Sequence, residues 1–474
     1  MTIPIHRPIP RPKRLVAAFV TLTLSGCASF SADGGFKRVE GEAQSRLGTN
    51  VQVPRPADSP ATSQVRALLA KPLSADDAVQ IALLNNPGLK ASLAELQIAE
   101  ADLVQAGRLR NPGFSFARLK RGTEIELERT FTLDILGLFA IPLKTEIESR
   151  RFEQAQLGAA GDVLKLAAET RRAYFSAVAA QESLAYLEQV KIAAETSAEL
   201  AQRMAQVGNW SKLAQMREQL FYAESTSQLA RAKQTVIAER ERLTRLMGLW
   251  GSDLGFKLPE RLPELPAKAI ERTEVEATAL QSRLDLQMAK QEVAGMAQSI
   301  GLSKATRFVN VLDLGYQHNT SNEAPRQTGY EIDIQIPIFD WGDAKIARAE
   351  AAYRQAVNRT AETAINARSE AREAYQSYRT AFDLARHYRD EIVPLRKKIS
   401  DEQLLRYNGM LIGVFELIAD AREQVMSVNG YIEALRDYWL AETGLQGALS
   451  GPGGGMLRAV GQSPSLPAAT GGGH

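Results

Sequence analysis

Two short segments of this chain alternate strictly between apolar and polar residues. In the first segment the apolar residues are Ile125, Leu127, Phe131, Leu133 and Ile135, and the polar residues between them are Glu126, Glu128, Thr130, Thr132 and Asp134. In the second, Tyr330, Ile332, Ile334, Ile336 and Ile338 alternate with Glu331, Asp333, Gln335 and Pro337. A period of two predicts strands with one apolar and one polar face. Phe114 and Phe116 indicate a hairpin partner for the first strand, and residues 309–316 for the second.

Each alternating segment precedes a much longer helical pattern. The first helix is expected to begin at Pro142 and to reach about Gln206, so its roughly sixty-five residues would extend about 100 Å. Its seam repeats every three or four residues and consists mostly of small side chains: Leu166, Thr170, Ala173, Ala177, Ala180, Leu184, Leu187, Ala194, Ala198, Ala201 and Ala205. The second runs from about Ala344 to Tyr407 with a kink at Pro394, and its seam begins at Ile346, Ala349, Tyr353, Ala356, Thr360, Thr363 and Ala367.

A glycine-containing turn and a returning helix follow each long helix. The first returning helix is expected to pack through Leu213, Met216, Leu220, Ala223, Ser227, Ala230 and Ile237. Each pair therefore predicts an antiparallel coiled hairpin. The order of elements occurs twice, which indicates a duplicated unit rather than a solenoid. We expect a first repeat at 73–250 with a β-hairpin at 113–136, a Pro-rich linker at 251–270, and a second repeat at 271–450 with a β-hairpin at 308–339.

Four strands of about ten residues match the length that crosses a bilayer when tilted. Four strands cannot close a barrel, and open edges are not tolerated in lipid, so other copies must supply the rest. We therefore expect a mainly α fold with a small β part. Long antiparallel helical hairpins would form a trimeric α-barrel, continued by a 12-stranded β-barrel with four strands per protomer. The polar rows would face the pore, which makes Glu126, Glu128, Glu331 and Asp333 candidate pore-lining residues.

The N-terminal segment has the pattern of a lipoprotein signal, expected at 1–26. Basic residues precede a short apolar stretch at 15–24, which ends in Leu24-Ser25-Gly26-Cys27, the pattern of a bacterial lipobox. Cys27, the only cysteine, is therefore expected to be lipidated, and Ala28 after it favours the outer membrane. An extended linker is expected at 27–72 and a disordered tail at 451–474. With 57 basic and 55 acidic residues, a nucleic-acid surface is not expected.

The chain resembles the TolC-like outer-membrane efflux proteins, and within them the lipoprotein branch. The opening helix from Leu73-Ser74-Ala75-Asp76-Asp77 to Asn86-Pro87 carries this resemblance, as do the junction Ile336-Pro337-Ile338-Phe339-Asp340-Trp341-Gly342 and the two turns at 207–211 and 407–413. It covers about 73–449. The junction at 136–142 lacks the Asp-Trp-Gly form, which leaves the start of the first long helix open.

The resemblance implies a homotrimeric exit duct in the outer-membrane lipid. A periplasmic adaptor and an inner-membrane pump would load this duct. The tips of the helical hairpins would contact the adaptor, and the tip residues are Gly208, Asn209, Trp210, Gly409, Met410 and Gly413. By the same match, Glu416 and Asp420 are candidates for an acidic ring at the periplasmic aperture.

Other kinds of site have little support in the sequence. His6, His318, His387 and His474 are far apart, so no metal site or cofactor is expected. No nucleophile elbow, Ser/His/Asp order or phosphate loop indicates an enzyme. Two alternatives to a general efflux channel stay open: a heavy-metal efflux duct, copper-type among them, and a coiled-coil envelope scaffold lipoprotein without a pore.

Overall fold

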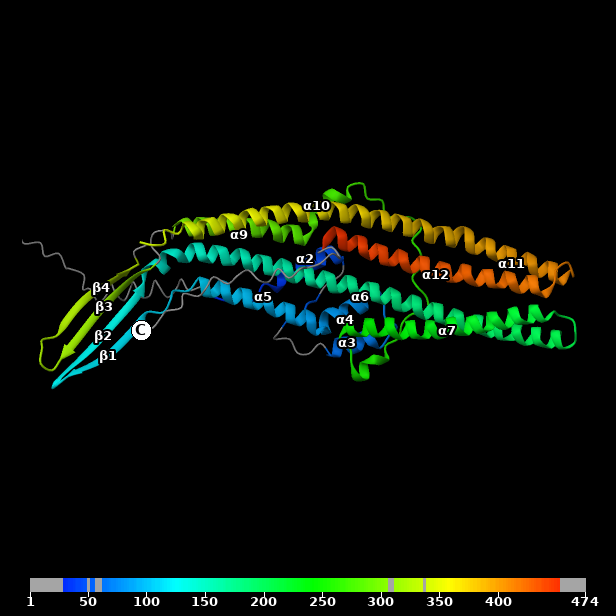
Figure 1. The fold of residues 1–474 in the computed structure, drawn as a ribbon, viewed down its shortest axis with the longest axis horizontal. Coiled ribbons are helices and arrows are strands. Elements are labelled where there is room, and N and C mark those ends of the chain that lie inside the picture. Colours follow the sequence, from blue (N-terminus) through cyan, green and yellow to red (C-terminus); the bar gives the residue numbers. More distant parts are fainter. Residues whose placement is uncertain (1–28, 49–51, 56–61, 306–310, 336–337, 452–474) are drawn as a thin grey trace, which may run out of the picture. The chain divides into compact units, whose positions relative to one another are not determined.

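Long helices and one antiparallel sheet make up this chain (Figure 1). The structure is a computed structural model that describes residues 29–48, 52–55, 62–305, 311–335 and 338–451. The expected signal at 1–26, Cys27 and the tail beyond Gly451 lie outside the described residues, as do Ile336 and Pro337 of the second junction.

The first repeat has two helices, two strands and a long helical hairpin. Its elements are α4 (Ala75–Asn85), α5 (Pro87–Ala106), β1 (Gly113–Arg121), β2 (Glu124–Asp134), α6 (Ile135–Gln206) and α7 (Lys212–Met247). Ser74 begins α4 with a capping box, in which its side chain accepts from the backbone of Asp77 and the Asp77 carboxylate accepts from the backbone of Ser74. The helix ends before Pro87, as its sequence predicts.

The second repeat has the same order of elements. They are α8 (Val275–Ser282), α9 (Leu284–Ala305), β3 (Leu312–Ser321), β4 (Gln327–Ile334), α10 (Asp343–His387), the π-helical segment η2 (Tyr388–Ile392), α11 (Val393–Asn408) and α12 (Val414–Ser450). A short 3-10 helix, η1 (Gly251–Gly255), lies between the repeats. The predicted irregularity at Pro394 is therefore a π-helical segment immediately before that residue.

The sheet joins the two repeats. Its strand order is β1-β2-β3-β4, and all neighbours are antiparallel. The central pairing, β2 with β3, connects the hairpin of the first repeat to that of the second, with Thr132 opposite Gly315. Among the strands that the structure describes, β1 and β4 each have one edge without a partner strand.

The chain divides into two compact units, and neither is a sequence repeat. Among the described residues, one unit combines 29–37 with residues of 93–156 and 288–361, and the other combines residues of 38–92, 157–287 and 362–451. Each unit takes equivalent parts of the expected repeats at 73–250 and 271–450, because matching elements of the two halves pack together, as β2 and β3 do.

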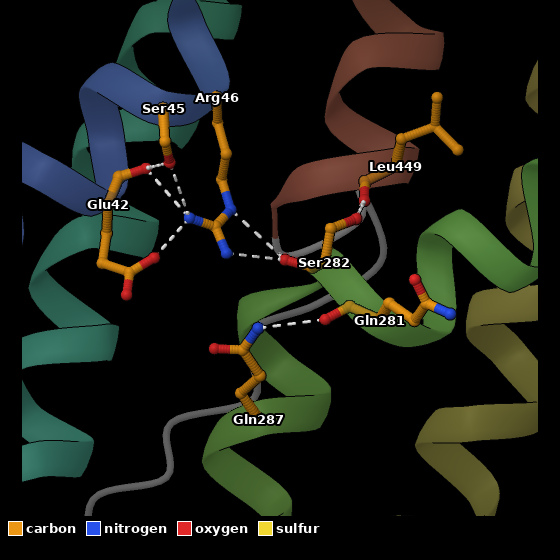
Figure 2. Close-up of polar contacts among 7 residues, drawn as sticks. All are labelled: Glu42, Ser45, Arg46, Gln281, Ser282, Gln287 and Leu449. Atoms are coloured by element: carbon orange, nitrogen blue, oxygen red, sulfur yellow. Dashed lines mark hydrogen bonds and ion pairs between the residues drawn. The ribbon is translucent and has the colours of Figure 1, made fainter.

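The segment expected to be an extended linker at 27–72 contains two helices, α2 (Phe36–Leu47) and α3 (Thr62–Leu69). Their short sequences give little local signal, and tertiary contacts hold α2 in place. Val39 and Ala43 on one face of α2 are buried. Arg46 donates to the carbonyl oxygen of Ser282 at 2.8 Å, and the Ser282 hydroxyl donates to the carbonyl of Leu449 at 2.6 Å (Figure 2). The segment is thus tied to the beginning of the second repeat and to the end of α12.

The first long helix begins earlier than its sequence suggests. Pro142 was expected to open it, but α6 begins at Ile135 and Pro142 lies inside the helix. The Asp134 carboxylate accepts a hydrogen bond of 2.6 Å from the backbone N–H of Gly137, which satisfies a free donor in the first turn. Pro142 leaves only the carbonyl of Leu138 without its helical donor, a cost that the helix tolerates near its end.

The expected seams of α6 and α10 are found, whereas the expected seam of α7 is wrong. On α6, Ala173, Ala177, Ala194 and Ala201 are buried. On α7, the predicted seam residues Leu213, Met216, Leu220 and Ile237 are all exposed in the single chain. The buried positions of α7 are instead Glu218, Ser225, Leu243, Thr244 and Met247. The inward face of α7 is partly polar, so the spacing of its apolar residues indicated a different face of the helix.

An aromatic cluster forms the centre of the unit that contains 157–287. Tyr378 and Phe382 of α10 contact Tyr438 of α12, with ring centroids 5.7 and 5.8 Å apart. Trp439 stacks on Phe175 of α6 at 5.1 Å. Since Tyr378 and Phe382 are almost fully buried, this cluster stabilises α6, α10 and α12 against one another.

Candidate functional site

The four predicted pore-lining residues lie on one face of the sheet. Residues directly opposite one another share a face, and so do alternate residues along a strand. Thr132 lies opposite Gly315, and Gly315 lies opposite Glu331. Glu126 and Glu128 are separated from Thr132 by even numbers of residues along β2, and Asp333 is two residues from Glu331 along β4, so each lies on the same face as its reference residue. All four candidates therefore belong to a single surface, here called the polar face.

The polar face carries more carboxylates than the four predicted pore-lining residues. Asp134, Asp313 and Asp333 lie opposite one another on three successive strands. Asp313 could have been found, because it lies between Leu312 and Leu314 in the same alternating pattern. Among the described strand residues the only cation on this face is Arg121, and its carboxylates are Glu124, Glu126, Glu128, Asp134, Asp313, Glu331 and Asp333. The electrostatic field of this face thus favours cations.

The opposite face of the sheet, here called the apolar face, is exposed in the single chain. Its large side chains in the described strands include Phe114, Phe116, Phe131, Leu133, Leu314, Tyr316, Tyr330, Ile332 and Ile334, all of which are exposed. Tyr330 is 84% exposed and Ile332 is 64% exposed. An apolar surface of this extent marks an interaction surface rather than a solvated one.

The two hairpin tips have the same backbone geometry. At the first tip, Gly208 has φ +77° and the N–H of Asn209 donates to the carbonyl of Met204 at 2.9 Å. At the second tip, Met410 has φ +58° and the N–H of Leu411 donates to the carbonyl of Arg406 at 2.9 Å. Each is a Schellman turn with its left-handed residue in the equivalent position.

The left-handed residue is a glycine at the first tip, Gly208, but not at the second, although the second turn contains two glycines. Gly409 has φ −78°, and Gly413 has φ −85° and precedes α12 as its N-cap. The left-handed residue is Met410, whose side chain is 93% exposed. Asn209 is also exposed, and Trp210 is half-buried.

The two candidate aperture residues have different surroundings. Glu416 and Asp420 are one turn apart on α12, but Glu416 is exposed and Asp420 is 9% exposed. Asp420 Oδ2 has no hydrogen-bond partner among the described residues. In the single chain they are thus not a matching pair of solvated carboxylates.

A buried ion pair near the tips was not expected from the sequence. The Glu218 carboxylate of α7 is fully buried and accepts from Arg422 of α12 at 2.7 Å and from the Ser197 hydroxyl of α6 at 2.8 Å. The Arg422 guanidinium lies 4.2 Å from the centre of the Phe221 ring. A lone Glu on a helix gives no sequence signal of such burial, because its partners come from other helices.

Within the residues that the structure describes, no group of three or more His, Cys, Asp or Glu residues is placed to hold a metal ion. None of the helices described has a stretch that is apolar for long enough to cross a membrane.

Comparison with known proteins identifies the fold. No protein-family model matches the chain. A solved structure of VceC, an outer membrane protein from Vibrio cholerae, superposes with a TM-score of 0.66 at 15% identity, over 80% of this chain and 96% of that one. CusC, whose structures were studied for folding and transmembrane channel formation, superposes with a TM-score of 0.64 at 18% identity, over 80% of this chain and 92% of that one. The expected resemblance to TolC-like outer-membrane efflux proteins is thus confirmed at the level of the fold.

One curated relative also aligns in sequence. The cobalt-zinc-cadmium resistance protein CzcC of Cupriavidus metallidurans is 24% identical over 284 residues, which are 57% of this chain. The match spans 64% of that protein's length.

Proposed function

We propose that this chain is the outer-membrane exit channel of a tripartite efflux system, through which substrates pass passively. The observation that carries this proposal is the separation of the sheet into a carboxylate-rich polar face and an exposed apolar face. A sheet with these two faces suits a wall between water and lipid. The fold shared with VceC and CusC supports it.

Three copies of the chain would form the channel. No described strand of the chain pairs with the outer edges of β1 and β4, and such edges are costly in lipid unless another strand pairs with them. Three four-stranded sheets would give the twelve-stranded barrel, and the helical hairpins would continue it as a tube. The polar face, with Glu126, Glu128, Glu331 and Asp333, would line the pore, and Glu416 with Asp420 would lie near the periplasmic aperture.

The hairpin tips would meet the periplasmic adaptor, which receives substrate from the inner-membrane pump. Val207, Met410 and Leu411 are apolar and exposed at these turns, as expected of a surface that another protein covers. Gly208, Asn209, Trp210, Gly409 and Gly413 complete this contact. A lipid on Cys27 would add an anchor in the outer membrane, with the helical part in the periplasm.

Reconstitution of the full-length mature protein tests the channel directly. We expect a native mass of three protomers in detergent and discrete conductance steps in planar bilayers. A scaffold lipoprotein without a pore would bind membranes through its lipid but would give no conductance. A stable monomer inserted in lipid would contradict the trimer.

A second candidate within the same class is a duct for metal cations. The carboxylates of the polar face greatly outnumber its cations, which favours the passage of cations. The sequence similarity to a protein named for cobalt, zinc and cadmium resistance favours it as well. We expect the channel to be cation-selective, and E331Q/D333N to reduce this selectivity. Restored zinc or copper tolerance in a strain that lacks its own duct would favour the metal duct over general efflux.

A further inference from the structure

We propose that one end of the apolar face binds the phosphate groups of lipid headgroups at the membrane surface. The binding residues are Arg118, Lys120 and Arg129, with His318 beside them, and they are here called the cationic rim. This inference rests on the proposed function, because it requires the apolar face to contact lipid. It adds a lipid-binding site to the channel.

The strand register places the cationic rim on the apolar face. Arg118 lies opposite Leu127, Lys120 opposite Ile125, and Arg129 opposite Phe116. The Arg129 guanidinium approaches the His318 ring nitrogen Nδ1 at 3.5 Å and the Thr320 hydroxyl at 3.5 Å, both from β3. The rim therefore extends across three strands at the end near the β1–β2 turn.

An aromatic row separates the cationic rim from the aliphatic part of the same face. Phe114, Phe131, Tyr316 and Tyr330 form this row across all four strands. The Phe114 and Phe131 ring centroids are 4.9 Å apart, and those of Tyr316 and Tyr330 are 5.7 Å apart. Such rows occur where the hydrocarbon of a bilayer meets its headgroups.

Distance along the strands puts the cations at headgroup level. Arg129 is two residues beyond Phe131, or about 7 Å along the strand, and Arg118 and Lys120 lie further in the same direction. The aliphatic side chains Leu133, Leu314, Ile332 and Ile334 lie on the other side of the row. Phe116, Ile125 and Leu127 lie among the cations, whereas the described strand residues beyond the aromatic row include no cation on this face. The cations are thus confined to one side of the row, as expected where hydrocarbon gives way to phosphate in a membrane.

The rim has no anionic partner within the protein. In the described residues of the four strands, the apolar face carries no Asp or Glu, whereas the polar face carries many. Arg118, Lys120 and Arg129 form no ion pair within the part of the chain that the structure describes. Arginine and lysine bind phosphate through charge-assisted hydrogen bonds, so an anionic headgroup would satisfy them. A band that extends over three of the four strands suits a lipid surface better than one acidic protein side chain.

Lipid binding to the purified full-length protein tests the proposal. Native mass spectrometry would compare retention of phosphatidic acid with that of phosphatidylcholine of the same acyl chains. Each cation near an anionic membrane surface is expected to contribute about fivefold to affinity. The wild type should therefore prefer phosphatidic acid, and R118Q/K120Q/R129Q should weaken its binding at least about tenfold. The preference should also decrease as salt increases.

Matched variants separate the rim from general effects. E124Q/E126Q/E128Q removes three charges at a similar level of the opposite face and should keep the preference. R118K/K120R/R129K conserves the positive charges and should also retain the preference for phosphatidic acid. Equal retention of phosphatidic acid by the wild type and by the glutamine variant would overturn the proposal. It would also be overturned if inorganic phosphate displaced phosphatidic acid equally well from the wild type and from the glutamine variant. If the rim instead binds an acidic protein, the wild type should retain phosphatidic acid and phosphatidylcholine equally.

Conductance of the same samples tests the proposed function separately. A protein that conducts but shows no dependence on the rim contradicts only the lipid site. A protein that prefers phosphatidic acid through the rim but does not conduct contradicts only the channel.

Discussion

Arg422 and Glu218 join the two helical hairpins about two helical turns from their tips, with 2.7 Å between Arg422 Nη2 and Glu218 Oε1. Glu218 is fully buried, while the Arg422 side chain is 28% exposed. Removal of the cation would leave a buried carboxylate without its partner, which is the costly way to break an ion pair.

We expect R422M to destabilise the protein by about 3 kcal/mol and E218Q/R422M to recover part of that loss. The double variant recovers because no buried charge is left unpaired. Thermal unfolding of the detergent-solubilised protein provides the measurement. The control is R396M, which removes an exposed pair between Arg396 and Glu423 at 2.9 Å and should cost at most about 1 kcal/mol. Equal losses for R422M and R396M would show that burial of Glu218 is unimportant.

The left-handed residues at the tips predict opposite effects of two substitutions. G208A should destabilise the first hairpin by about 1 kcal/mol, because alanine is strained at φ +77°. M410G should be neutral or stabilising by up to about 1 kcal/mol, because it relieves the same strain at the second tip. Both changes are measurable by unfolding. A destabilising M410G would mean that the exposed Met410 side chain contributes contacts that outweigh its backbone strain.

Gly413 allows docking to be tested without disturbing the fold. Its φ is −85°, and a Cβ there would meet no atom within 4 Å. We expect G413W to fold and assemble as the wild type does but to lose efflux, because the bulky side chain would occupy the proposed adaptor surface. Unfolding and native mass report on the fold, and substrate accumulation in cells reports on efflux. Full efflux by G413W would place the adaptor contact elsewhere.

The two faces of β4 predict different costs for arginine. I332R should destabilise the inserted protein by about 2–4 kcal/mol if this position lies near the middle of the bilayer. E331R, the adjacent residue on the polar face, should fold with little loss and should reduce cation selectivity. Refolding into vesicles gives the first quantity, and reversal potentials in planar bilayers give the second. The opposite pattern would mean that the faces are assigned the wrong way round.

Glu182 should make stability depend on pH. Burial raises the pKa of this carboxyl above its ordinary value of 4.5, although the backbone N–H of Leu262 donates to it at 2.9 Å. Below the unfolded-state pKa this carboxyl is neutral in both the folded and the unfolded state, so it does not lower the free energy of unfolding. As pH rises, the unfolded state ionises first, so stability falls until the folded-state pKa is passed.

E182Q cannot ionise and still accepts the Leu262 hydrogen bond. Relative to the wild type, it should become progressively more stable as pH rises above the ordinary carboxyl value of 4.5, until the raised pKa of the folded state is passed. Thermal unfolding across this range measures the difference. E188Q removes a charge at an exposed position of the same helix and serves as the control. A difference between E182Q and wild type that is constant with pH would contradict the role of burial.

Local patterns predicted much of this fold. The opening helix that ends before Pro87, the alternation along β2 and β4, and the small-residue seam of α6 each depend on residues close together in sequence, and each is found in the structure. Alternation also placed Glu331 and Asp333 on the same face as Glu126 and Glu128, once the pairing of β2 with β3 is known.

Features that depend on distant partners were missed. Helix α2 owes its position to contacts such as Arg46 with Ser282, more than two hundred residues away. The inward face of α7 contains Glu218, which only Arg422 and Ser197 make tolerable there. Met410 adopts a backbone conformation that its residue type does not suggest, because the turn geometry around it determines the angle.

The π-helical segment at 388–392 sets the rotational phase of the second tip. The N–H of Val393 donates to the carbonyl of Tyr388, one residue further back than in an α-helix. One additional residue turns everything after it by about 100° around the helix axis. The first long helix, α6, is α-helical throughout from Ile135 to Gln206. Two tips with the same turn geometry thus follow helices built differently, and only at the second has an inserted residue turned the side chains that a protein binding end-on would meet.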